Sequence, residues 1–210
     1  WQTNGLTDMF TAQQALLNAS PDVVRLILIA FTAGFAVKMA VFPVHMWLPD
    51  AHSEAPAPMS ALLSGVIISA GAYAIIRLSF GVVFPAVGVN FGTPFLYSLA
   101  IIGVITAFFG SLLSLVANDI KRVIAYSSIA HMGYIMFGLS LFPVSLAAGS
   151  VVVIGSSLAV VGTVLHIVTH AASKGLFFLT AGGVMHQTEK RDIREMGGLA
   201  GKMPFSAVSG

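Results

Sequence analysis

The chain has 210 residues, of which 57% are hydrophobic and only 9% are charged, and its formal net charge is +2. Soluble domains carry about 25% charged residues, so this composition excludes an ordinary water-soluble domain and indicates a membrane protein. The sequence contains no cysteine, which excludes disulfides, thiolate metal sites, iron–sulfur clusters and cysteine nucleophiles within it.

Long apolar segments predict an all-α, polytopic transmembrane helix bundle, because stretches of about 18 or more apolar residues are typical of membrane-spanning helices. We expect one transmembrane domain over residues 1–210. Its expected spans are, in chain order, 23–50, which is broken, and then 59–77, 94–117, 123–141 and 149–186. The last span is longer than the ~20 residues that one crossing needs, so we expect it to be tilted, bent or to begin outside the membrane.

The two ends of the sequence indicate a longer chain. The opening WQTNGLTDMFTAQQALL lacks the basic region of a signal peptide, and the ending KMPFSAVSG stops where a new apolar run begins. We therefore expect the sequence to be the middle of a longer protein.

Basic residues are distributed unequally between the two expected sides of the membrane. One side has only Arg25 and Arg77. The other side collects Lys121, Arg122, Lys190, Arg191, Arg194 and Lys202. Because basic loops stay in the cytoplasm, we predict that the second side is cytoplasmic.

Lys38 stands in an apolar run, with twelve uncharged residues before it and eleven after it. A charge at the centre of a bilayer costs about 2.5–3.5 kcal/mol on insertion scales. Pro43 interrupts the helix five residues later, since proline lacks the N–H and crowds the preceding turn. Broken helices beside ionisable groups are typical of transporter sites, so we predict that Lys38 gains and loses protons. Two structural alternatives stay open: a lysine that reaches the membrane surface, or a permanent ion pair with a helix outside this sequence.

A second group of titratable residues lies in LHIVTHAASKGLFF. His166, His170 and Lys174 recur every four residues and therefore share one helix face. Because histidine titrates near neutral pH, the row predicts a proton relay through bridging water. His131, in AYSSIAHMGY, fits either a hydrogen bond between helices or a step of the same polar path.

Metal chemistry is not indicated. His166 and His170 have a metal-ligand spacing, but HIVTH lacks the glutamate of HExxH and no carboxylate in the spans completes a zinc site. Haem ligation would need a second histidine on a neighbouring helix, and His131 is the only other histidine deep in an expected span. We expect no catalytic residue, no metal and no cofactor. The residues after the break, which are His45, Asp50, His52 and Glu54, are expected to be solvated or to form a gate.

Four blocks of the sequence resemble one family. They read KMAVFPVHMWLPDAHSEAPAPMSALLSG, NDIKRVIAYSSIAHMGYIMFGL, LHIVTHAASKGLFFLTAG and RDIREMGGLAGKMP. They are similar to the proton-translocating, antiporter-like subunits of respiratory complex I, Mrp-type Na⁺/H⁺ antiporters and membrane-bound nickel–iron hydrogenases. The sequence of the first block is most similar to that of archaeal hydrogenase-type complexes. Members have about fourteen helices, so the resemblance implies the central third to half of a longer fold.

The resemblance also implies which residues translocate protons. A key lysine on a broken helix is matched by Lys38, and a central relay is matched by His166, His170 and Lys174. The glutamate that pairs with the lysine would precede residue 1, and a second broken helix would follow residue 210. Several members carry a bridging lysine on the helix after WLPDAH, where this sequence has Ser69 in GVIIS, so Ser69 is only a candidate path residue.

We therefore expect a subunit that translocates protons, with or without coupling to Na⁺, inside a redox-driven respiratory or hydrogenase complex. It would have no redox chemistry of its own. Its expected partners are other membrane subunits and the lipid bilayer of the cell membrane, and not nucleic acid. The alternatives are a subunit of a stand-alone Mrp-type cation/proton antiporter and a purely structural membrane anchor.

Overall fold

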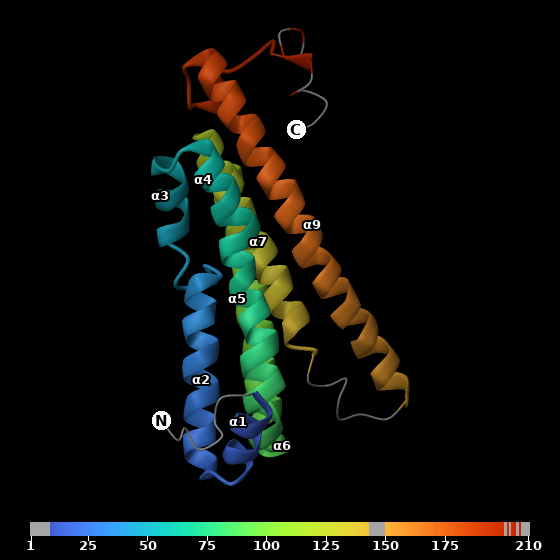
Figure 1. Cartoon of the computed structure of the whole chain (residues 1–210). Helices are drawn as coiled ribbons and strands as arrows, with labels where there is room; N and C mark the ends of the chain where they lie inside the picture. The colour runs from blue at the N-terminus through green and yellow to red at the C-terminus, as the bar shows by residue number, and fades with distance from the viewer. Residues whose placement is uncertain (1–8, 143–149, 200, 202, 205, 207–210) are drawn as a thin grey trace.

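The computed structural model describes residues 9–142, 150–199, 201, 203, 204 and 206, and the helices among them form an elongated bundle (Figure 1). These elements are α1 (Met9–Leu17), α2 (Pro21–Lys38), α3 (Trp47–Glu54), α4 (Ala57–Leu62), the π-helix η1 (Leu63–Ile67), α5 (Ile68–Ala74), the π-helix η2 (Ile75–Val83), the 3-10 helix η3 (Phe84–Ala86), α6 (Val89–Val116), α7 (Ile120–Leu139), α9 (Ser150–Thr188) and the 3-10 helix η4 (Ile193–Glu195). Within the described ranges, the only β-type contact is an isolated antiparallel bridge between Asp119 and Asp192. The expected start of the last span at residue 149, and Lys202, lie outside the described residues.

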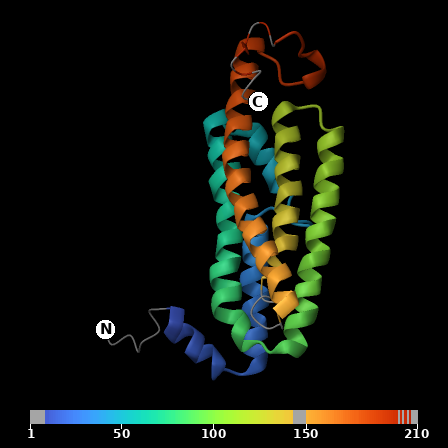
Figure 2. The ribbon, with the colours of Figure 1, turned by 90° about the vertical axis from the view of Figure 1, so that its right-hand side faces the viewer.

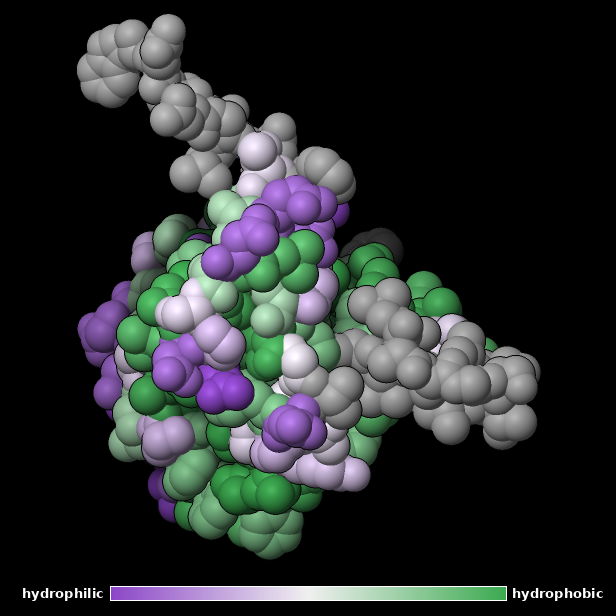
Figure 3. All heavy atoms as spheres, turned by 90° about the horizontal axis from the view of Figure 1, so that it is seen from below, coloured by the Kyte–Doolittle hydropathy of each residue, from purple (hydrophilic) through white to green (hydrophobic). Residues whose placement is uncertain are grey.

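Among the described residues, three helices are long and apolar enough to cross a membrane by length and composition. They are Ala57–Ala86, Asn90–Val116 and Ser157–Thr188. Large apolar side chains such as Leu26, Leu115 and Leu158 are exposed on the outside of the bundle. The view onto the α1 end shows hydrophilic residues in separate patches on a largely apolar surface (Figure 3). The predicted all-α membrane bundle with a broken helix is confirmed.

The helices differ in how they lie in the bundle. The rod from α4 to η3 stands beside α2, and α6 lies on the far side of α7 from this rod, whereas α9 crosses the group obliquely (Figures 1 and 2). Helix α9 packs against α4 and η1 in its upper part, and it also packs against α7. The row of titratable residues on α9 therefore faces other helices of the same bundle.

Small residues allow α6 and α7 to approach closely, as is typical of membrane helices. A Cβ atom on Gly133 of α7 would lie 2.3 Å from the Ala107 backbone nitrogen, and one on Gly110 of α6 would lie 2.5 Å from the Ala130 nitrogen. In both cases the obstacle is backbone, which cannot rotate away. The two helices can therefore pack at this distance only with glycine at these positions.

We expect Gly133→Ala to force α6 and α7 apart and to lower the melting temperature of the full-length protein in detergent. Overpacking of a tight interface costs about 1–3 kcal/mol. Gly175→Ala on α9 is the matched control, because an added Cβ there meets no atom within 4 Å. Equal melting temperatures for the two variants would contradict this account of the α6–α7 contact.

The break between α2 and α3 lies where the sequence predicts it. Helix α2 ends at Lys38, and Ala40 has a φ of 54°, a left-handed conformation that is unfavourable for residues other than glycine. The Phe42–Pro43 peptide bond is cis. Helix α3 begins at Trp47, four residues after this bond.

Polar partners compensate the backbone groups that the break leaves free. The Phe42 N–H donates to Thr106 Oγ1 of α6 at 3.1 Å, and the Trp47 indole Nε1–H donates to the Val37 carbonyl at 3.0 Å. Non-helical backbone at membrane depth requires such partners. Thr106 and Trp47 therefore stabilise the break.

The segment AHSEAPAP, which follows the expected end of the first span at residue 50, begins as a helix. Helix α3 continues to Glu54, and Ala55 is extended with a ψ of 146°. Pro49 is tolerated because it lies in the first turn of α3, and Pro56 ends the helix because the residue before a proline is disfavoured in the helical conformation. His52 and Glu54 thus belong to helix α3.

Candidate functional site

The titratable row of α9 faces α7 and contacts its histidine. His131 Nδ1 lies 3.0 Å from His166 Nε2, and the two ring centroids are 5.1 Å apart. The His131 ring centroid is also 5.4 Å from that of His170. Three histidines from two helices therefore form one cluster, in which His131 can act both as a contact between helices and as a step of a polar path.

Lys174 extends the cluster toward the end of α9. Its side chain is buried, and its Nζ donates to Ser127 Oγ of α7 at 2.5 Å. Ser127 Oγ donates in turn to the Ile124 carbonyl at 2.8 Å. The structure thus brings Lys174 and all three predicted relay histidines together between α7 and α9.

Several buried polar atoms on α5 and α9 have no hydrogen-bond partner in the described part of the chain. Both ring nitrogens of His170 and the Ser69 hydroxyl lack a hydrogen bond to any described residue, although both side chains are buried. Buried polar groups normally have a partner, which can be water. The surroundings of His170 and Ser69 thus have the chemistry that a chain of water molecules requires.

Lys38 lies apart from this cluster. It is the last residue of α2, its side chain is exposed, and it makes no hydrogen bond or ion pair with a described residue. Among the described residues, no contact joins it to the α9 row. The structure therefore places Lys38 at the break, on the outside of this part of the chain.

The four candidates after the break separate into two pairs. Asp50 forms an exposed ion pair with Arg122 at 2.9 Å, and Glu54 is also exposed. His45 and His52, which we expected to be solvated or to form a gate, are 5% and 0% exposed, so solvation is ruled out for these two and a place in a gate stays a prediction. The burial has a physical reason in each case: the His52 ring lies on that of Phe178 where α3 packs into the bundle, and the His45 ring stacks on that of Phe42.

Sequence reasoning missed a set of basic side chains that hold α3 in place. Lys121 is 5% exposed, and its Nζ donates to the Ala55 carbonyl at 2.6 Å. Arg191 donates to the Ser53 carbonyl and forms an ion pair with Asp119 at 3.2 Å. Cations at the carboxyl end of a helix are stabilising. In the sequence, the NDIKR motif indicates only the start of a helix. Asp119 accepts hydrogen bonds there from the backbone N–H groups of Lys121 and Arg122.

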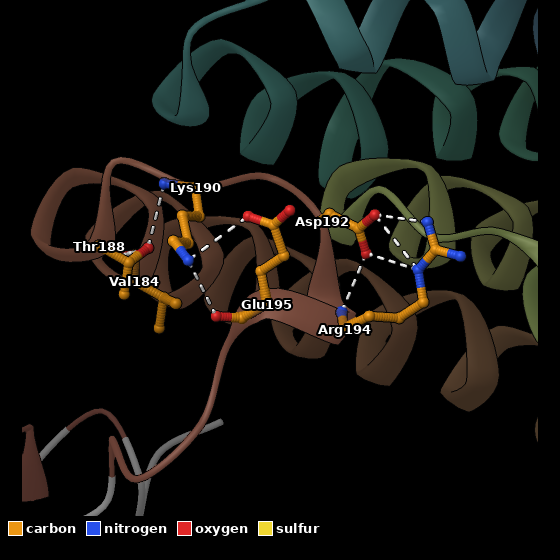
Figure 4. A network of polar contacts seen from close by, with 6 residues as sticks. All are labelled: Val184, Thr188, Lys190, Asp192, Arg194 and Glu195. Atoms are coloured by element: carbon orange, nitrogen blue, oxygen red, sulfur yellow. Dashed lines mark hydrogen bonds and ion pairs between the residues drawn. The ribbon is translucent and has the colours of Figure 1, made fainter.

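The segment after α9 is fixed to the turn between α6 and α7. Ile120 N donates to the Arg191 carbonyl at 3.0 Å, and Ile193 N donates to the Asn118 carbonyl at 2.9 Å. The segment also has ion pairs of its own, Lys190–Glu195 and Asp192–Arg194 (Figure 4). The hydrogen bonds from Arg194 lower the pKa of Asp192 to about 2. The end of α9 is therefore fixed to the α6–α7 turn by backbone hydrogen bonds and by the ion pair between Arg191 and Asp119.

The fold and the site define a polytopic membrane bundle with a row of buried and partly buried titratable groups between α7 and α9. Over residues 1–209 the chain matches the family described as NADH:quinone oxidoreductase/Mrp antiporter, TM. It is 39% identical over 186 residues to NADH-quinone oxidoreductase subunit M of Pseudomonas aeruginosa. The matched region covers 89% of this chain and 33% of that protein. The chain therefore belongs to this family of antiporter-like membrane subunits, and it spans about a third of the length of the curated relatives it matches.

Solved structures show the same relationship. The structure of an archaeal respiratory membrane complex, the membrane-bound sulfane sulfur reductase, matches with a TM-score of 0.77 and 28% identity, over 94% of this chain and 38% of that one. The Mrp complex from Dietzia sp. DQ12-45-1b matches with a TM-score of 0.72 and 25% identity, over 88% and 30%. The resemblance inferred from the four sequence blocks is confirmed.

Proposed function

We propose that this chain is the ion-translocating part of an antiporter-like subunit that moves protons across the cell membrane, with or without coupling to Na⁺. The observation that carries the proposal is the cluster of His131, His166, His170 and Lys174 between α7 and α9, in which His170 and Lys174 are buried and the other two are partly buried. The cluster joins two helices by a 3.0 Å contact between histidines and a 2.5 Å bond from lysine to serine. Such a row of exchangeable groups in a bundle interior is typical of a proton path.

The driving reaction would come from partner subunits. The relative from Pseudomonas aeruginosa is a subunit of an NADH-quinone oxidoreductase, and one matching structure is a respiratory sulfane sulfur reductase complex. We propose that this chain likewise works inside a redox-driven complex of the respiratory or hydrogenase type, with Lys38 as a second translocating group at the helix break. A stand-alone cation/proton antiporter is the second candidate, and the match to the Mrp complex favours it.

Reconstituted vesicles test the proposal. We expect the full-length protein, purified with its partner subunits, to acidify vesicles when an electron donor and acceptor are supplied, and not when they are omitted. Exchange of Na⁺ for H⁺ without any redox substrate would favour the antiporter instead. A preparation that transports neither ion would leave only the membrane-anchor function.

A further inference from the structure

Helix α6 contacts the helix break through the hydroxyl of Thr106. Thr106 is 0% exposed, and its Oγ1–H donates to the Ile102 carbonyl of its own helix at 2.7 Å. The same oxygen accepts the Phe42 N–H of the break at 3.1 Å. A threonine hydroxyl has one donor and two acceptor positions, so the bond to Ile102 uses the proton and leaves lone pairs for Phe42. Thr106 therefore presents a fixed acceptor to the break.

Phe42 is the residue that attaches the break to α6. Among the described residues, the N–H groups of Ala40, Val41 and Val44 bond only to carbonyls within residues 36–41. The Phe42 N–H bonds to α6 instead, and the Phe42 ring stacks on that of Phe109, with centroids 5.3 Å apart and an angle of 12° between the planes. Phe109 follows Thr106 by three residues and lies on the same face of α6. Helix α6 therefore holds Phe42 at two points, the backbone and the ring.

The end of α2 depends on support from outside its own segment. The Ala40 N–H donates to the Val37 carbonyl at 3.0 Å and the Val41 N–H to the Ala36 carbonyl at 3.1 Å, which is the Schellman ending of a helix. The left-handed residue of this ending is usually glycine, because a Cβ atom is unfavourable there, but here it is Ala40 with a φ of 54°. Residues in such conformations persist where the surrounding contacts hold the backbone. The contacts of Phe42 with α6 are of this kind.

Helix α6 is in turn held closely against α7. Ala107, next to Thr106, lies so near Gly133 that a Cβ atom added to Gly133 would be 2.3 Å from the Ala107 nitrogen. Gly133 follows His131 of the titratable cluster by two residues. The break is therefore attached to the same pair of helices that carries His131.

We infer that Thr106 and Phe109 are positioning residues for ion translocation, which fix the helix break, with Lys38 at its start, against the α6–α7 pair. The inference rests on the proposed function. Helix α6 has no charged residue and no histidine, so it acts through the place it gives to Phe42 and carries no proton. Without this attachment, the break would keep its internal hydrogen bonds but lose its fixed place relative to the histidine cluster.

Valine and serine at position 106 separate the hydroxyl from the packing of the side chain, in the full-length protein with its partner subunits in vesicles. Thr106→Val keeps the volume and removes the acceptor, whereas Thr106→Ser keeps the hydroxyl and removes a methyl group. We expect Thr106→Val to assemble, to lose about tenfold in pumping per assembled complex, and to exchange the amide hydrogens of residues 38–46 about tenfold faster, because the Phe42 N–H loses its buried acceptor. Thr106→Ser should keep most of the pumping. A side chain that serves only packing would give the reverse order.

The matched control is Ser111→Ala, because the Ser111 hydroxyl bonds only to the Ala107 carbonyl of its own helix, at 2.8 Å. Phe109→Leu tests the second point of attachment, whether or not Thr106→Val assembles. Phe109 is 43% exposed, so leucine fits there while the stacking on Phe42 is lost. We expect about a threefold loss of pumping and faster exchange at the break. Phe108→Leu, at the exposed neighbouring residue, is its control and should pump normally.

The outcomes separate the attachment of the break from the proton path. Normal pumping by Thr106→Val, or an equal loss in Thr106→Ser, would show that the hydroxyl does not decide transport and would overturn the inference. If Lys174→Met stops pumping while Thr106→Val and Phe109→Leu pump normally, the proposed function stands and only the inference falls. If Lys174→Met pumps normally, the proposed function falls and the inference falls with it.

Discussion

Lys174→Met and His170→Gln are each expected to assemble normally and to lose about a hundredfold in proton pumping, the lower end of what a positioned acid or base contributes to proton transfer. Methionine has a similar length to lysine and suits a side chain that is only 4% exposed. It removes the charge and the bond to Ser127. Glutamine keeps hydrogen-bonding capacity at His170 but cannot titrate. A network that serves only packing would tolerate both changes, whereas a relay would not.

Yield, co-purification of partner subunits and thermal melting in detergent measure assembly, and the rate of acidification in vesicles measures pumping. Thr169→Val is the matched control, because Thr169 neighbours His170 on α9 but is exposed and bonds only within its own helix. It should pump at close to the normal rate. If Lys174→Met or His170→Gln assembles and pumps normally, that residue is no obligatory step and the path runs elsewhere.

Helix type and the break could be predicted from the sequence, because each depends on local chemistry. Long apolar runs require helices in a membrane, and Pro43 interrupts a helix wherever it stands. The shared face of His166, His170 and Lys174 follows from a spacing of four residues. These predictions need no knowledge of which helices are neighbours.

Contacts between segments far apart in the sequence could not be predicted in this way. The burial of His52 depends on α3 packing on α7 and on Phe178 lying against its ring, and neither fact has a local signal. The same holds for Lys121, whose ammonium binds a carbonyl 66 positions earlier in the chain. Without knowledge of the tertiary contacts, a polar residue next to prolines is assigned to a solvated segment.

The second prediction concerns Lys38, which has no hydrogen-bond or ion-pair partner among the described residues. We expect Lys38→Ala to leave the melting temperature nearly unchanged, since the side chain is exposed at the end of α2 and no hydrogen bond or ion pair within the described part of the chain is lost. We expect the same variant to lose about a hundredfold in pumping if the lysine is a proton carrier at the break.

Lys38→Arg distinguishes the remaining roles of this lysine. Arginine keeps the positive charge at all working pH values and cannot give up its proton in a protein. A permanent ion pair with another helix would therefore be preserved in Lys38→Arg, and pumping would recover. A proton carrier would fail in both variants, which is the result we expect. Lys190→Ala, at an exposed lysine paired with Glu195, is the control and should pump normally. Normal pumping by Lys38→Ala would instead assign the lysine to the membrane surface, and the helix break would then have to act without a titrating group of its own.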